Sequence, residues 1–215
     1  MATIELKPIQ HAPIPTDRAR LEQRARRLAW GGNAWHLIEF AVAVGAGIVA
    51  GSIALIGFGA DSLIEGVAAF AIIWLFTGIR LASSTAERRA QLMIAASYFL
   101  LAAYVAVESI RNFTGGAHPE VSWVGIGLAA VTAPTMPLLA RAKRNVGRQL
   151  GSSATVSEAE QNMICAYLSI ALLVGLLANA IAGWWWADPA AALVIAAVAL
   201  REGRESWRGE RCDCS

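Results

Sequence analysis

The stretch Gly51–Leu75, GSIALIGFGADSLIEGVAAFAIIWL, decides the fold because it is long and apolar enough to cross a bilayer. It nevertheless carries two acidic residues near its middle, Asp61 and Glu65. They are four residues apart, so on a helix they lie on one face, one turn from each other. A carboxylate at membrane depth is costly and has to be compensated by a partner, a proton or a cation. The pair therefore predicts half of a cation site.

The rest of the chain repeats the pattern of long apolar runs. The hydrophobic fraction is 56% and charged residues make up only 16%, which is far from the composition of a soluble domain. Most of the runs approach the length of about 20 residues that a spanning helix needs. The runs are Leu28–Ala50, Ser52–Ile79, Gln91–Ile110, Val121–Ala140, Asn162–Ala182 and Trp185–Leu200. The sequence therefore predicts an all-α membrane protein with six transmembrane helices and turns at Gly51 and Gly183.

Basic residues indicate how this bundle is oriented. They gather before the first run, between the second and third, between the fourth and fifth, and after the sixth. By the positive-inside rule both termini are expected in the cytoplasm, and Trp184–Trp186 at the outer interface, although a tryptophan run can also form a binding surface. We expect a cytoplasmic segment at 1–27 that starts disordered, a transmembrane domain at 28–205 and a tail at 206–215, in the cell (inner) membrane. The net charge of +2 is too small to indicate a nucleic-acid partner.

The first run carries further polar residues at a similar depth. His36 and Glu39 are three residues apart and share a helix face. His36 lies about 14 Å from one membrane surface and Asp61 about 15 Å from the other, at 1.5 Å per residue. These side chains either complete the cation site or form an interhelical hydrogen bond that only fixes packing.

The fifth run begins with polar residues on one face, where Gln161 and Cys165 are four apart and Glu158 precedes them by one turn. A cysteine thiolate suits zinc, cadmium or copper(I) better than magnesium or calcium. A single buried cysteine, however, commonly behaves as a small hydrophobe. Cys212 and Cys214 in the tail form a further candidate for soft metals.

Other charged residues have structural interpretations. Glu108 and Arg111 form an expected i,i+3 pair near the outer edge. Asp188, followed by proline, is expected to cap the sixth helix. Glu202 is expected in a solvated helix end.

Two segments together resemble the cation diffusion facilitator family of divalent-metal transporters. GSIALIGFGADSLIE is similar to the family's second helix, with Asp61 and Glu65 at its acidic positions. NAIAGWWWADPAAALVIAAVALREG is similar to its junction between the fifth and sixth helices. The resemblance implies six helices, cytoplasmic termini and proton-coupled efflux of a divalent metal ion. Together with faces of small residues and a surface on the third and sixth helices, it also implies a homodimer.

The chain departs from the family pattern on the fifth helix and at its end. The family places His or Asp, three other residues and then Asp on that helix. Here the equivalent turn offers Gln161 with Cys165, or Asn162 with Ala166 in a register one residue later. Many members continue into a cytoplasmic metal-binding domain, so we expect a small tailless branch of the family.

These observations lead to an expected function. We expect a carrier that exports a divalent transition metal by alternating access, with zinc first and cadmium, cobalt, iron and manganese as alternatives. The expected ligands are Asp61, Glu65, Cys165, Gln161, His36 and Glu39. The alternative is a membrane metal sensor or partner-binding subunit that does not transport. An enzyme is not expected, because the sequence has no HExxH or GxSxG motif.

Overall fold

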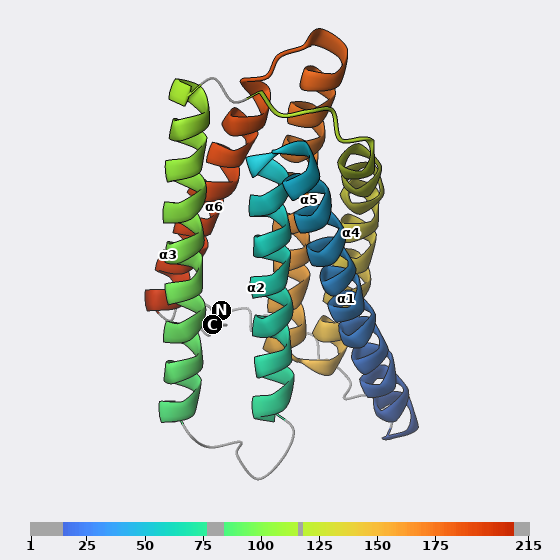
Figure 1. Cartoon of the computed structure of the whole chain (residues 1–215). Helices are drawn as coiled ribbons and strands as arrows, with labels where there is room; N and C mark the ends of the chain where they lie inside the picture. Colours follow the sequence, from blue (N-terminus) through green and yellow to red (C-terminus); the bar gives the residue numbers. More distant parts are fainter. Residues whose placement is uncertain (1–14, 77–83, 116–117, 209–215) are drawn as a thin grey trace, which may run out of the picture.

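The computed structural model describes residues 15–76, 84–115 and 118–208, and this part of the chain forms six α-helices without a strand (Figure 1). The helices are α1 (Pro15–Ala50), α2 (Ile53–Phe76), α3 (Ser84–Gly115), α4 (Trp123–Leu150), α5 (Ser153–Ala182) and α6 (Ala187–Arg208). The all-α class and the number of helices are confirmed. Cys212 and Cys214 lie outside the described residues.

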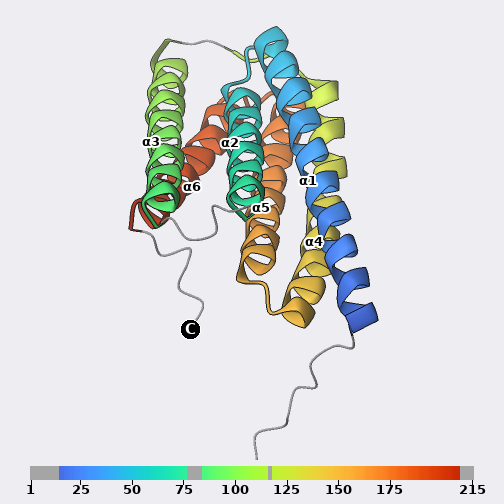
Figure 2. The ribbon, with the colours of Figure 1, turned by 90° about the horizontal axis from the view of Figure 1, so that it is seen from below.

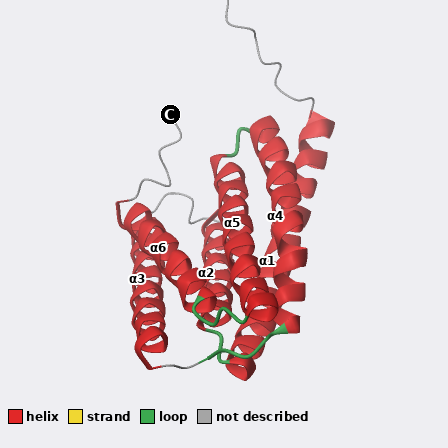
Figure 3. Ribbon diagram, turned by 90° about the horizontal axis from the view of Figure 1, so that it is seen from above, coloured by secondary structure: helices red, strands yellow, loops and turns green. Residues whose placement is uncertain are grey.

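The helices pack as two groups. α1 packs on α2 and α4, and α4 packs along α5, while α3 packs along α6 (Figure 1 and Figure 3). α2 lies between the two groups, because it contacts α1 and α5 on one side and α3 and α6 on the other. Seen from below, the start of α1 and the end of α4 lie at the same end of the bundle (Figure 2). The helix with the acidic pair therefore lies at the centre of the bundle.

Tight turns join neighbouring helices into antiparallel hairpins. Gly51, Gly151 and Gly183 each have a φ of 64°, a left-handed conformation that glycine adopts without steric cost. The turns at Gly51 and Gly183 were predicted, and the turn at Gly151 adds a hairpin between α4 and α5. Two of the hairpins, α1–α2 and α4–α5, pack against each other, α1 on α4 and α2 on α5.

Four helices are long and apolar enough to cross a membrane, counting only the residues that the structure describes. Their candidate spans are Arg18–Ala50, Leu92–Gly115, Trp123–Leu150 and Thr155–Ala182. Large apolar side chains face outward on these helices, including Val49, Leu100 and Ile181, which are 83%, 73% and 82% exposed. Such an outer surface is unfavourable in water and matches the acyl chains of a bilayer.

Asp188 differs from its expected role as the cap of α6. α6 already begins at Ala187, and the fully buried Asp188 carboxylate turns to the neighbouring helix. It accepts hydrogen bonds from the Ser52 hydroxyl and from the backbone amides of Ile53 (3.0 Å) and Ala54 (3.4 Å). These amides begin α2 and carry its partial positive charge. The carboxylate therefore caps α2 and ties it to α6.

Glu202 is also placed differently from the expectation of a solvated helix end, since only 4% of it is exposed. The cause is the next residue: a Cβ on Gly203 would lie 3.0 Å from the Phe99 ring, so α6 packs closely against α3 here. The expected surface pair is confirmed, with Arg111 Nη1 lying 2.7 Å from Glu108 Oε1.

Candidate metal centre

Four buried side chains from three helices meet inside the bundle, and we call them the polar cluster: His36 and Glu39 from α1, Glu65 from α2 and Cys165 from α5. His36 Nδ1 lies 3.2 Å from Glu39 Oε2 and 3.6 Å from Glu65 Oε2. Cys165 Sγ lies 4.0 Å from Glu39 Oε2. None of the four is more than 5% exposed. The structure therefore brings together residues that are far apart in the chain and that the sequence singled out.

The spacing of the cluster is close to that of a metal site. His36, Glu65 and Cys165 each offer one ligand atom, and these three atoms lie within 4.8 Å of one another. Tetrahedral zinc, with bonds of about 2.0–2.3 Å, holds its ligand atoms about 3.5 Å apart. Small side-chain movements would close that difference. Glu39 is placed to supply a fourth ligand atom.

Glu39 is held in place by hydroxyl groups of other helices. Thr132 Oγ1 of α4 donates a hydrogen bond of 2.6 Å to Glu39 Oε1. Ser62 Oγ of α2 lies 3.5 Å from Glu39 Oε2 and 3.1 Å from the Phe58 carbonyl of its own helix, so its single hydrogen serves one of the two acceptors. The first oxygen is thus occupied, while the second faces His36 and Cys165. Sequence reasoning missed Thr132 and Ser62, because single hydroxyl residues in apolar helices usually bond to their own backbone.

The polar residue that α5 adds beside Cys165 is Asn162. Its Nδ2 lies 3.5 Å from His36 Nε2 and 3.2 Å from the sulfur of Met136 on α4. Gln161 is only partly buried, and its Nε2 has no hydrogen-bond partner among the described residues. Asn162 and Cys165 are three residues apart, a combination that neither sequence register contained. Nothing in the sequence indicated that Met136 contacts the cluster, because a methionine in an apolar run is usually a packing residue.

Asp61 lies one helical turn before Glu65, toward the start of α2. Its side chain is only 3% exposed. It is not one of the three residues whose ligand atoms lie within 4.8 Å. Asp61 therefore borders the cluster on the side away from the start of α1.

Some polar atoms in this region have unmet hydrogen-bonding capacity. His36 Nδ1, Asn162 Oδ1 and Asn33 Nδ2 are buried and make no hydrogen bond to any residue that the structure describes. His36 Nδ1 is close to two carboxylates but is not aligned with either. A buried polar atom without a partner costs about 1–3 kcal/mol. Carboxylates, a thiol and an imidazole nitrogen without a hydrogen bond are group types that could hold a metal ion.

The comparisons with known proteins agree with this chemistry. Residues 34–208 match the family model described as the cation efflux transmembrane domain. The matched region includes every residue of the polar cluster and most of the 215-residue chain. A search of the curated proteins found no match.

Proposed function

The chain belongs to the cation efflux family, and on that premise we propose that it moves a divalent transition-metal ion across the membrane through the polar cluster. The observation that carries the proposal is the approach of three ligand atoms, from His36, Glu65 and Cys165, to within 4.8 Å. Three helices contribute these ligands, so a bound ion would join α1, α2 and α5 in one place. Family members are transporters, and no enzymatic activity is proposed for this chain.

Zinc is the proposed substrate. Imidazole nitrogen, carboxylate oxygen and thiolate sulfur are all ligands that zinc accepts, in a tetrahedral arrangement. Cysteine favours zinc and cadmium over the harder manganese, while cobalt and iron accept the same set. Asp61 lies one turn beyond the cluster and supplies a carboxylate on the way out of it. A panel of metals in one flux assay ranks these candidates.

Transport requires that the cluster open in turn to each side of the membrane. Its residues are buried from both ends of the bundle, so rocking of the two helix groups against each other would expose it alternately. Glu65, Glu39 and Cys165 bind metal in their deprotonated forms, so metal binding displaces protons. Release of the ion on the outer side would allow these groups to take up protons again. This linkage supports metal–proton antiport.

The basic loops and the exposed apolar side chains suggest how this carrier lies in its membrane and how two copies meet. The basic connections favour a cytoplasmic position for both termini, and the proposed transmembrane domain at 28–205 would lie in the cell membrane. Outward apolar side chains continue along α3 and α6, including Leu100 (73% exposed) and Val194 (48%). We propose this surface as the contact of a homodimer.

The test is zinc flux into liposomes that contain the purified protein. Glu65→Gln and His36→Ala are expected to stop flux, because each removes a ligand from the cluster. Glu108→Gln is the matched control, since that acidic residue lies on α3 beside Arg111 and outside the cluster. Undiminished flux in Glu65→Gln would disprove the site. Zinc binding without flux in the unmodified protein would favour a sensor over a carrier.

A further inference from the structure

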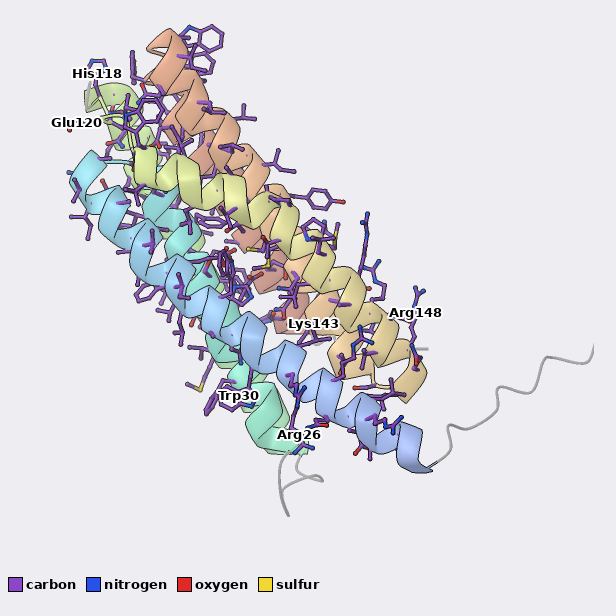
Figure 4. The ribbon with its side chains drawn as sticks, turned by 90° about the vertical axis from the view of Figure 1, so that its right-hand side faces the viewer. Arg26, Trp30, His118, Glu120, Lys143 and Arg148 are labelled. Carbon is purple, nitrogen blue, oxygen red and sulfur yellow. The ribbon has the colours of Figure 1, made fainter. Side chains whose placement is uncertain are left out.

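A second buried charged group lies close to the polar cluster. Lys143 Nζ of α4 lies 3.1 Å from Glu158 Oε2 of α5, with the two side chains 4% and 8% exposed. Glu158 precedes Asn162 by four residues, which is about 6 Å along the helix axis. Figure 4 shows Lys143 between the two ends of the bundle, toward the end that holds Arg26 and Arg148 and away from His118 and Glu120. We call the former the arginine-rich end.

The Lys143 ammonium also reaches α1. A Cβ on Gly32 would lie 2.9 Å from Nζ, so the ammonium lies directly against the α1 backbone. Gly32 precedes His36 by four residues, again about one turn. Lys143 thus spans α4, α1 and α5, the helices that surround the cluster on this side. Side chains on a helix lean toward its N-terminus, and along α4 this direction leads from Lys143 toward the cluster.

This inward position is unusual for a lysine. A lysine near the end of a membrane helix normally extends its charge to the water. The Lys143 ammonium is instead buried between Glu158 and the α1 backbone at Gly32. A buried ion pair also loses hydration, and apolar residues of similar size stabilise a bundle as well or better. Packing alone therefore does not explain why Lys143 and Glu158 are buried together.

α4 lacks two backbone hydrogen bonds between the cluster and Lys143. Pro134 and Pro137 lie inside the helix, and each one lacks the amide that would bond to the preceding turn. They follow Thr132, which contacts Glu39, and precede Lys143. Prolines inside helices are sites of kinks and of hinge motion. The backbone hydrogen bonds that Pro134 and Pro137 cannot make lower the cost of bending α4 between Thr132 and Lys143.

We propose that Lys143 and Glu158 close the approach to the polar cluster from the arginine-rich end. The Lys143 side chain fills the space beside Gly32, and Glu158 holds it inward. When the pair separates, Lys143 turns toward the water and the approach along α1, α4 and α5 opens. The proposal rests on the proposed function in one respect, that the cluster is where the ion binds.

The experiment uses Cys165 as a reporter of access, independently of transport. Replacing Cys212 and Cys214 by serine leaves Cys165 as the sole cysteine of the chain. Its reaction rate with a small, membrane-impermeant methanethiosulfonate is measured without metal, in vesicles of either orientation. Glu158→Gln and Lys143→Ala are expected to raise the rate at least about tenfold, because loss of one partner abolishes the pairing. The increase is expected only when the reagent is added on the side of the arginine-rich end.

Matched variants separate this role from general destabilisation. The double variant Lys143→Glu with Glu158→Lys restores opposite charges, so its rate should return to within about twofold of the parent. Arg201→Gln breaks an exposed pair of 2.8 Å with Glu205 and should leave the rate unchanged. Gly32→Ala alters neither charge, yet its methyl group would collide with Nζ, so it should also raise the rate.

The outcomes distinguish the two proposals. Unchanged rates in both single variants and in Gly32→Ala, or equal increases from both sides, would overturn the closure by Lys143. Rates that respond as expected, in a protein without zinc flux, would support the closure and disprove the carrier. If zinc flux depends on Glu65 but the Cys165 reaction rate does not change in the Lys143 and Glu158 variants, the carrier is supported and the closure is disproved.

Discussion

Asp188 and the polar cluster are two ways in which this protein buries acidic groups. The Asp188 carboxylate accepts hydrogen bonds from a hydroxyl and from backbone amides at the start of α2. Glu39 receives a hydrogen bond of 2.6 Å from Thr132 at one oxygen, while its other oxygen shares a small space with His36 and Cys165. The protein satisfies the first carboxylate with its own donors. It surrounds the second with groups that are themselves good ligands.

The difference teaches how to tell a structural acid from a functional one at membrane depth. A carboxylate at a helix N-terminus gains from hydrogen bonds and from the helix dipole, so it contributes to stability. Carboxylates placed near each other and near a thiol repel one another when ionised. Such a group costs stability until a cation binds. Neutralising the two kinds of acid should therefore have opposite consequences.

The largest expected effect is on transport, in Glu65→Gln. Zinc flux should fall to background, because even groups that only support a metal ligand reduce metal affinity about 10–100-fold when mutated. The unfolding temperature in detergent should stay equal or rise, because one buried charge is removed. If the variant loses flux and also unfolds at a much lower temperature, Glu65 is structural like Asp188. The proposed difference between Asp188 and the acidic residues of the polar cluster would then be wrong.

Asp188→Ala is expected to act on stability instead. It leaves the Ser52 hydroxyl and the first amides of α2 without their acceptor, which should cost about 3 kcal/mol of unfolding free energy. Chemical unfolding in detergent measures this loss, and zinc binding per folded molecule should be unchanged. Glu108→Ala is the control, because an exposed pair of this kind contributes about 0–1 kcal/mol. Equal losses in the two variants would contradict the capping role of Asp188.

The helices and their polar stripes were predictable from the sequence, because both follow from spacing along one helix. Six apolar runs predict six helices, and the rise per residue predicts His36 and Asp61 at a similar depth. In the structure His36 Nδ1 lies 3.6 Å from Glu65 Oε2, one turn further along α2 than Asp61. The turns at Gly51 and Gly183 followed from glycine between apolar runs. What joins these features is that each depends on neighbouring residues in the chain.

The remaining features depend on how helices face one another. An acidic residue before proline looks the same whether it caps its own helix or, like Asp188, the neighbouring one. Which residues of α5 meet α1 depends on how α5 is rotated, so Asn162 with Cys165 was not foreseen. Lys143 and Glu158 belong to different helices, and the sequence does not predict that they are buried and paired.

Cys165→Ser is expected to change metal preference more than overall transport. A hydroxyl replaces the soft sulfur ligand, while the nearby His36 and Glu65 remain. The ratio of cadmium to zinc flux should fall about tenfold, since cadmium depends more on the thiolate. Competition between the two metals in the same liposomes measures the ratio. An unchanged ratio would place Cys165 among the structural residues of α5 and would restrict the functional cluster to α1 and α2.

The smallest expected effect tests how closely α1 and α2 must approach for the cluster to form. A Cβ on Gly59 would lie 2.8 Å from a methyl group of Val44, whereas one on Gly45 would have no neighbour within 4 Å. Gly59→Ala should therefore cost about 1–3 kcal/mol of unfolding free energy through overpacking, and Gly45→Ala should be neutral or slightly stabilising.

The same substitution should also affect metal binding. Gly59 lies on the helix that carries Glu65, and Val44 on the one that carries His36, so forcing these helices apart also lengthens the distance between the two ligands. Zinc affinity should consequently fall in Gly59→Ala and not in Gly45→Ala. Weaker affinity in both variants would mean that helix propensity, rather than the distance between α1 and α2, controls the site.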